Sequence, residues 1–339
     1  MNVYINYLDV LTTHGYWSEI SKSLFWGELN SIANDRAYFS ERKIDRKKVC
    51  SELYNRLEEK NISSSNTLYI YIDRTCSDNL EIRQAGWSGD YFIEKMINNC
   101  RFEITDKIVM SNACASIGYA ISLAKKYIFN GIYENVMIFS LDLITLYEYE
   151  SMRSLKVLSN ESAKPFSEAR NGININDGGG ILLLGSNPLS KNSPLILGCE
   201  THENFHSGSL TNSEDISILL RNFSDIKFDV IVAHAAGTPK GDAEELSALQ
   251  CFAGSEYIPI TSIKGAIGHS LYSSGLAQIA CALDMIKVNY IYPTVGYTKS
   301  GHSSGGAFVN TQPFRKNVEK VLVNMFGFYG NYSAIAIGE

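Results

Sequence analysis

Short apolar runs rich in β-branched residues alternate along this chain with longer segments in which apolar residues recur every three to four positions. The first pattern is typical of buried strands and the second of amphipathic helices. Alternation of the two favours an α/β layered architecture over an all-α or an all-β one. The short runs predicted to be strands are residues 108–110, 136–140, 181–184, 228–233, 321–324 and 334–337.

Two of the helical segments share a design. Residues 117–129 place isoleucine and alanine side chains on one face and end at Gly131, which suits a helix stop. Residues 274–287 repeat this pattern. Each segment follows a predicted strand and begins in a run of small residues, which lets helices approach closely at a two-fold or pseudo-two-fold axis.

This likeness predicts a duplicated fold within a single domain, residues 1–339. The expected halves are residues 1–190 and 191–339, which meet near residues 185–195. A Pro/Gly/Ser-rich linker is absent between them, and residues 187–194 are predicted to form a surface turn.

Composition narrows the class of protein. The chain has 339 residues, of which 45% are hydrophobic and 19% charged, so it can bury a large core. Its net charge of -6 lacks the basic footprint that nucleic-acid binding requires. The seven cysteines show no CxxC pair, which predicts reduced thiols in the cytoplasm and neither a disulfide framework nor a metal site. We expect no signal peptide and no membrane insertion.

Three distant segments carry the candidate chemistry. Cys114 stands where a predicted strand becomes a helix, so free N–H groups and the positive helix end would favour its thiolate. Taken alone, Cys114 is better explained as a small buried hydrophobe than as a nucleophile. His234 ends a predicted strand, where α/β sheets commonly present functional groups, although a satisfied core histidine fits equally. His269 follows Gly268 in a glycine-bracketed loop, which by itself indicates little.

Taken together, five ordered motifs resemble those of the β-ketoacyl-acyl carrier protein synthase (ketosynthase) family, in the Cys-His-His branch of the thiolase-like fold. The family shows an Ala-Cys-small-Ser turn, an Arg-Pro-Phe-Asp stretch, a His-x-Thr-x-Thr-Pro-x-x-Asp-x-x-Glu loop, a Lys-x-x-x-Gly-His loop and an Asn-x-Phe-Gly-Phe-Gly-Gly turn. The corresponding segments here are residues 113–116, 164–180, 234–245, 264–269 and 324–330. The resemblance implies two pseudo-duplicated α/β halves in α-β-α-β-α layers.

The resemblance also implies catalytic roles. Cys114 would attack the thioester on a carrier protein's phosphopantetheine and take the acyl group. His234 and His269 would stabilise the enolate that forms when a malonyl extender loses carbon dioxide, and this enolate would attack the acyl group.

Further roles follow from the same motifs. The backbone N–H groups of Cys114 and Phe328 would form the oxyanion hole, and Phe328 would also gate the acyl pocket. Lys264, Glu245 and Asp242 resemble a buried charged network that positions the histidines. Thr238 would hydrogen-bond the pantetheine arm.

The implied function is decarboxylative condensation of an acyl-Cys114 intermediate with malonyl-acyl carrier protein in type II fatty-acid or polyketide-like synthesis. The expected partners are an acyl carrier protein and a second chain, in a homodimer or a heterodimer. No cofactor is expected beyond the carrier's phosphopantetheine.

Two departures from the family pattern keep an alternative open. Ala236 replaces the first threonine of the histidine loop, and Tyr329 replaces the glycine after Phe328. Both changes would suit a non-elongating relative, either an acyltransferase or a chain-length-factor-like partner of a ketosynthase, although such a partner usually lacks Cys114. A thiolase is disfavoured because no cysteine follows Cys281, and the coenzyme A-primed branch because it has asparagine where His269 stands.

Overall fold

A computed structural model describes residues 1–25, 28–29, 31, 46–58, 66–72, 106–205, 211–298 and 306–339. Strands and helices alternate through both halves of the chain. The elements of the first half are β1 (Tyr4–Thr12), β2 (Gly15–Tyr16), α1 (Trp17–Phe25), α3 (Arg46–Glu58), β3 (Thr67–Ile72), β4 (Asp106–Met110), α6 (Ser116–Phe129), β5 (Asn135–Asp142), α7 (Leu146–Ser154) and β6 (Gly178–Gly185).

The second half repeats this alternation with shorter strands. Its elements are β7 (Leu195–Glu203), α8 (Ser213–Leu220), η1 (Arg221–Phe223), β8 (Val230–Val232), α9 (Pro239–Ala253), β9 (Pro259–Thr261), α10 (Lys264–Ile267), η2 (Leu271–Ser273), α11 (Ser274–Val288), β10 (Tyr290–Ile291), β11 (Phe308–Val309), β12 (Phe314–Arg315), β13 (Lys320–Gly327) and β14 (Asn331–Gly338).

The main strands of the two halves have the same order. The first set runs β1-β6-β5-β3-β4 and the second β7-β14-β13-β8-β9. Numbered along the chain within each half, both read first, fifth, fourth, second, third. In each set the first two pairs are antiparallel and the last two are parallel. The predicted α/β architecture with two duplicated halves is therefore confirmed.

The two sets of strands meet edge to edge at β1 and β7. Tyr4 pairs with Leu195, and the N–H of Ile5 donates to the carbonyl of Pro194 at 2.8 Å. The turn at residues 187–194 precedes this junction and carries exposed side chains such as Leu189, as predicted.

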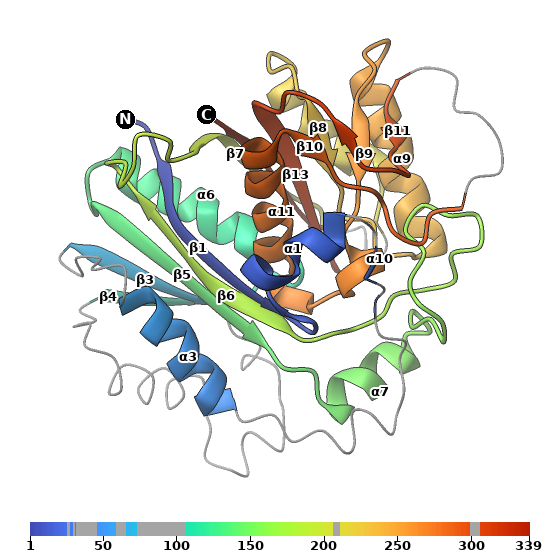
Figure 1. The fold of residues 1–339 in the computed structure, drawn as a ribbon, viewed down its shortest axis with the longest axis horizontal. Coiled ribbons are helices and arrows are strands. Elements are labelled where there is room, and N and C mark those ends of the chain that lie inside the picture. The colour runs from blue at the N-terminus through green and yellow to red at the C-terminus, as the bar shows by residue number, and fades with distance from the viewer. Residues whose placement is uncertain are drawn as a thin grey trace.

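Helices cover the strands in layers. Figure 1 shows α3 on one side of β3, β5 and β6, with α6 and α11 on the other. Apolar side chains of α3 pack against the outer face of the first set of strands, and those of α8 and α9 pack against the second set. The central cluster contains α6, α11 and the inner faces of both sets. This is the α-β-α-β-α order.

Small residues allow the central layer to be thin, as the sequence predicts. A Cβ atom at Gly275 of α11 would lie 2.8 Å from the Cβ of Ile117 on α6. A Cβ at Gly118 would lie 2.0 Å from Ser333 Oγ on β14. Neither position accommodates a side chain, so the two helices, which follow the segments of Cys114 and His269, pack closely at the centre.

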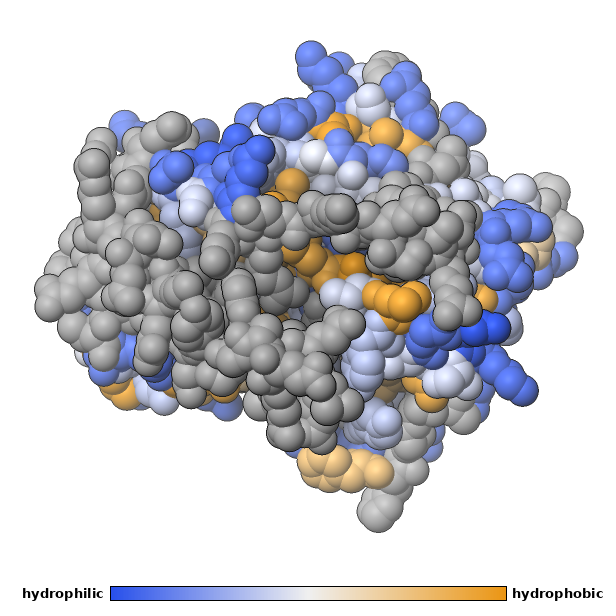
Figure 2. Space-filling view, turned by 90° about the horizontal axis from the view of Figure 1, so that it is seen from below, coloured by the Kyte–Doolittle hydropathy of each residue, from blue (hydrophilic) through white to orange (hydrophobic). Residues whose placement is uncertain are grey.

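All six predicted strands and both predicted helices are present, with small shifts at their ends. The segment expected at 228–233 is a strand only over Val230–Val232, although Ala233 continues the ladder by donating to Thr261 O at 2.8 Å. Within the described residues, every helix is too short or too polar to cross a bilayer. Figure 2 shows the face seen from below, where apolar residues gather near the middle between atoms drawn in grey.

Candidate active site

Cys114 lies in a tight turn between β4 and α6, as the sequence predicts. The turn is built on Ala113, whose φ of +48° is a left-handed conformation that L residues rarely adopt. Ser116, the first residue of α6, stabilises it. The Ser116 Oγ accepts from Asn112 N at 2.7 Å and donates to Ala113 O at 2.6 Å. The side chain of Cys114 therefore projects from a fixed bend at the start of a helix.

The Cys114 thiol is almost fully buried, and this changes its expected charge state. Burial raises its pKa to about 12, which outweighs the favourable charge of Lys264, while Asp142 adds to the rise. Burial therefore opposes the thiolate that the helix end would favour.

His234 follows β8 and is held through its ring. Nδ1 accepts from the backbone N–H of Phe326 at 3.1 Å and lies 2.9 Å from Lys264 Nζ. An N–H can only donate, so Nδ1 carries no proton. Burial and the charge of Lys264 lower the pKa of His234 well below its ordinary value. The ring is therefore neutral, with its one proton on Nε2.

Lys264 and Glu245 hold the backbone of His234 from two sides. Lys264 Nζ donates to His234 O at 2.6 Å. The Glu245 carboxylate accepts from His234 N at 2.8 Å, from Ala235 N at 2.7 Å and from Asn324 Nδ2 at 3.1 Å. Burial raises the pKa of Glu245 and lowers that of Lys264, whereas the three donors favour the ionised carboxylate. Lys264 and Glu245 therefore fix the backbone of His234 from both sides.

Asp242 organises the loop that leads from His234 into α9. Its buried carboxylate accepts from the N–H groups of Ala236, Gly237 and Thr238 at 3.0–3.2 Å, and from Phe166 N at 2.8 Å. Burial raises its pKa, and the N–H donors oppose that rise. These bonds satisfy N–H groups at the start of α9 and tie the loop to the segment at Phe166.

His269 is held differently, through its backbone. Its N–H donates to Asn174 O at 2.8 Å, and its carbonyl accepts from Asn176 N at 3.1 Å. The ring Nδ1 is buried and has no hydrogen-bond partner among the described residues. Burial and the charge of Lys264 lower the pKa of His269 well below its ordinary value. The His269 and His234 rings stand edge to face, with centroids 5.3 Å apart.

One pocket, partly open to solvent, brings the predicted residues together. Cys114, His234, His269, Thr238 and Phe328 line it, and Glu245 and Asp242 reach its wall. Lys264 lies behind His234. Sequence reasoning missed the apolar part of the wall, because Met152, Val157, Ile173 and Leu271 come from separate segments without a shared motif.

The turn between β13 and β14 borders Cys114. A Cβ at Gly327 would lie 3.1 Å from Cys114 N, so glycine leaves space in front of that N–H. Asn331 ties the turn by donating to Phe328 O at 2.8 Å. Tyr329 has a φ of +62°, where a glycine would be unstrained, and its side chain is 66% exposed. Its bulk therefore points to solvent.

Two further supporting residues were absent from the predicted roles. Asn324, the first residue of the terminal motif, is fully buried and bonds Glu245. Phe326 packs its ring against His234 at a centroid distance of 5.6 Å and supplies the N–H for Nδ1. The motif at residues 324–330 could have revealed both residues. Every second residue of a strand faces the same side, so Asn324 and Phe326 share a face.

Comparison with known proteins finds matches to one family of enzymes. Residues 222–298 match the family described as "Beta-ketoacyl synthase, C-terminal domain". The chain is 27% identical over 247 residues to 3-oxoacyl-[acyl-carrier-protein] synthase 1 of Buchnera aphidicola subsp. Baizongia pistaciae, a match that covers 67% of this chain and 60% of that protein. It is 26% identical over 261 residues to non-reducing polyketide synthase AC of Didymella fabae, covering 68% of this chain and 10% of that protein.

The matches therefore span less than two thirds of the length of these curated relatives. Among solved structures, the ishigamide ketosynthase/chain length factor superposes with a TM-score of 0.81 at 16% identity, covering 99% of this chain and 98% of the other. The strand order that the two halves of this chain share, and the order of the five motifs along it, agree with these matches. The chain is thus homologous to the 3-oxoacyl-acyl carrier protein synthases and polyketide ketosynthases, and it has their thiolase-like fold.

Proposed function

We propose that this protein is an acyltransferase of the ketosynthase type, which condenses an acyl group on Cys114 with a malonyl group on an acyl carrier protein. The observation that carries the proposal is the single pocket shared by one thiol and two neutral imidazoles. Neutral histidines donate hydrogen bonds without protonating an enolate outright, which suits a reaction that passes through one.

In the first step the sulfur of Cys114 attacks the thioester carbonyl of the acyl carrier. The new C–S bond forms first, and the C–S bond to pantetheine breaks when the tetrahedral intermediate collapses, with the thiol proton ending on the departing pantetheine. The N–H of Cys114, in the space kept open by Gly327, and the N–H of Phe328 would stabilise the tetrahedral oxyanion. Such a donor is worth about 3 kcal/mol of barrier.

In the second step the malonyl group loses carbon dioxide, and the electron pair of the broken C–C bond becomes an enolate. The Nε2–H of His234 would donate to the enolate oxygen, and His269 would supply the second contact. The enolate carbon attacks the acyl carbonyl, and the Cys114 sulfur leaves and takes up a proton. Lys264 helps by keeping the Nε2 tautomer of His234 in place.

Carrier-bound substrates fit the wall of the pocket. Thr238 presents a hydroxyl there and would contact the pantetheine arm, while the apolar residues face the acyl group. We propose an acyl carrier protein as the delivering partner, by analogy with the Buchnera synthase. A second chain of the same or a related kind is proposed because one structural neighbour is a ketosynthase with a chain length factor.

Intact-mass spectrometry tests the proposal. The protein is incubated with acyl-carrier protein and then with malonyl-carrier protein. We expect an acyl adduct that Cys114→Ala abolishes, followed by a β-ketoacyl product. Cys251→Ala is the matched control, because Cys251 is an exposed thiol outside the pocket and sets the background of nonspecific acylation. Acylation without decarboxylation would instead indicate an acyltransferase that does not elongate chains. Activity only beside a second ketosynthase chain would indicate a partner subunit.

A further inference from the structure

The loop that carries Lys264 and His269 is attached to the first half of the molecule by several hydrogen bonds, two of which involve Asn174 and Ser31. At its far end, His269 N donates to Asn174 O at 2.8 Å. Near its start, Gly265 O accepts from the N–H of Ser31 at 2.9 Å. Because Cys114 belongs to the first half, these attachments contribute to the position of His269 relative to the nucleophile.

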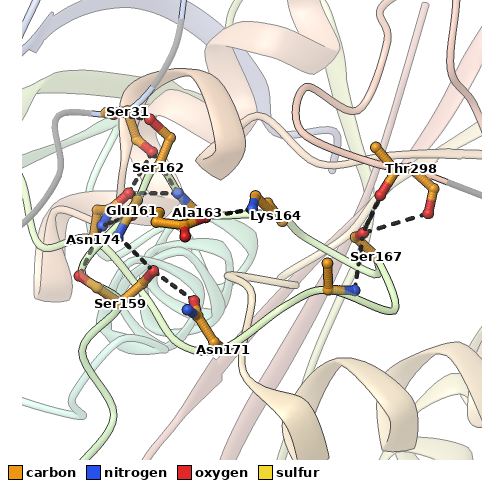
Figure 3. A network of polar contacts seen from close by, with 11 residues as sticks. Ser31, Ser159, Glu161, Ser162, Ala163, Lys164, Ser167, Asn171, Asn174 and Thr298 are labelled. Atoms are coloured by element: carbon orange, nitrogen blue, oxygen red, sulfur yellow. Dashed lines mark hydrogen bonds and ion pairs between the residues drawn. The ribbon is translucent and has the colours of Figure 1, made fainter.

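The side chain of Asn174 makes both attachments part of one network, which Figure 3 shows. It is 1% exposed, and its Oδ1 accepts from Ser31 Oγ and from Ala163 N, both at 2.6 Å. Its Nδ2 donates to Glu161 O at 2.8 Å. The carboxamide thus uses acceptor and donor sides at once, a role that neither aspartate nor leucine can fill.

Ser31 completes the connection. It is 2% exposed, and its Oγ also accepts from Ala163 N at 3.0 Å. Its carbonyl accepts from Ser162 Oγ at 3.1 Å. The residue therefore joins the loop at Gly265 to the same carboxamide whose backbone carbonyl binds His269. Loss of the Asn174 carboxamide leaves Glu161 O and the Ser31 hydroxyl without these partners, and loss of the Ser31 hydroxyl removes one of the two bonds at Asn174 Oδ1 and at Ala163 N.

The ring of His269 has little else to hold it. Its Nδ1 has no hydrogen-bond partner among the described residues, whereas His234 Nδ1 is bonded to Phe326 N. The direction in which the His269 ring enters the pocket therefore depends on its backbone. A shift of about 1 Å in a positioned group can cost on the order of a hundredfold in rate.

We propose that Ser31 and Asn174, here called the Ser31–Asn174 clamp, are positioning residues that set His269 against Cys114. The proposal deepens the proposed function and rests on it. The clamp acts on the step that uses His269, which is malonyl decarboxylation and condensation. Acyl transfer to Cys114 uses the turn at residues 112–116 and depends on the clamp much less.

The test separates the two half-reactions in Ser31→Ala and Asn174→Asp. We expect malonyl decarboxylation to fall at least tenfold, while the rate of Cys114 acylation stays within twofold of wild type. Ser167→Ala is the matched control. Ser167 is a fully buried serine at the other end of the network in Figure 3, where its Oγ lies 2.7 Å from Thr298 Oγ1. It should leave the ratio of the two rates unchanged at a similar loss in melting temperature.

A second readout does not need activity. Two-dimensional NMR spectra of the histidine rings should show the His269 resonances displaced in both clamp variants and unchanged in Ser167→Ala, with His234 moving less. Unaltered His269 resonances, or half-reactions that decline together, would overturn the clamp. If wild type neither acylates nor decarboxylates, the proposed function fails, and the NMR result still decides whether the clamp positions His269.

Discussion

His234 and His269 line the same pocket, are both neutral and belong to the same half of the chain. His234 is held through its ring as well as its backbone, whereas His269 is held through its backbone. The ring of His234 is held at Nδ1 by Phe326 N and Lys264, and its backbone is held by Glu245. The ring of His269 has no such bond at Nδ1 among the described residues, and its backbone is paired with residues 174–176. One imidazole is anchored directly and the other through its chain.

This difference teaches where each residue is vulnerable. A change in β13 or in the charged network acts on His234, whereas a change in the segments that pair with residues 264–269 acts on His269. Lys264 affects both histidines, because it starts the loop that carries His269 and bonds the ring of His234. The substitutions below remove one anchor at a time.

The largest effect is expected for Lys264→Met. It removes the two Nζ hydrogen bonds to His234 and the positive charge that acts on the buried Glu245, and breaking such buried charged contacts typically costs about 3–5 kcal/mol. Urea unfolding should show this loss, and decarboxylation should fall with it. Lys316→Met is the control, since its partner Asp229 is a half-exposed carboxylate. A loss below about 1 kcal/mol, as for an exposed pair, would contradict the anchoring role.

Gly268→Ala should disturb the anchor of His269 alone. Gly268 has a φ of +76°, and a Cβ there would lie 1.7 Å from Asn176 Oδ1. We expect a loss of unfolding free energy clearly above the ~1–2 kcal/mol of left-handed strain, with decarboxylation reduced more than acylation. Gly254→Ala shares the positive φ, at +56°, but has nothing within 4 Å, so it isolates the strain. Equal losses in the two variants would show that the contact with Asn176 relaxes.

The pH dependence of stability should be the same for both histidines despite their different anchors. Burial holds each folded pKa below the ordinary 6.5, so the unfolded chain takes up the proton first as the pH falls. Stability from each histidine is complete above pH 6.5 and is lost below it. Replacing either one with glutamine should reduce the slope of unfolding free energy there by up to about 1.4 kcal/mol per pH unit. A reduced slope in only one variant would mean that the other histidine is charged in the folded protein.

The smallest effect is expected for Tyr329→Gly, in the turn that follows the strand anchoring His234. Relief of the left-handed strain and the added chain entropy of glycine oppose each other, so unfolding free energy should change by less than about 1 kcal/mol. Acylation should stay within twofold, because the ring is exposed. A large loss of acylation would show that Tyr329 takes part in gating.

The sequence predicts which residues form this site better than it predicts the hydrogen bonds and the burial that fix them. The periodic segments around α6 and α11, and the motif residues Cys114, His234 and His269, are local patterns and lie where expected. The tautomer of His234 depends on a bond to Phe326, 92 positions away, and the clamp joins residues 143 positions apart. Such contacts arise from the pairing of β8 with β13 and from packing between halves, so no local pattern encodes them. The charge state of Cys114 depends on burial in the same way.

The repeated strand order gives the nucleophile a structural twin. Ala113 has a φ of +48° and lies three residues before the start of α6, and Leu271 has a φ of +46° and lies three residues before the start of α11. The position that matches Cys114 is therefore Tyr272. The same strained bend recurs where the second half bears a phenol instead of a thiol, so the strain belongs to the approach to each central helix. Backbone strain alone does not identify the reactive residue in this architecture; the side chain that the bend presents does.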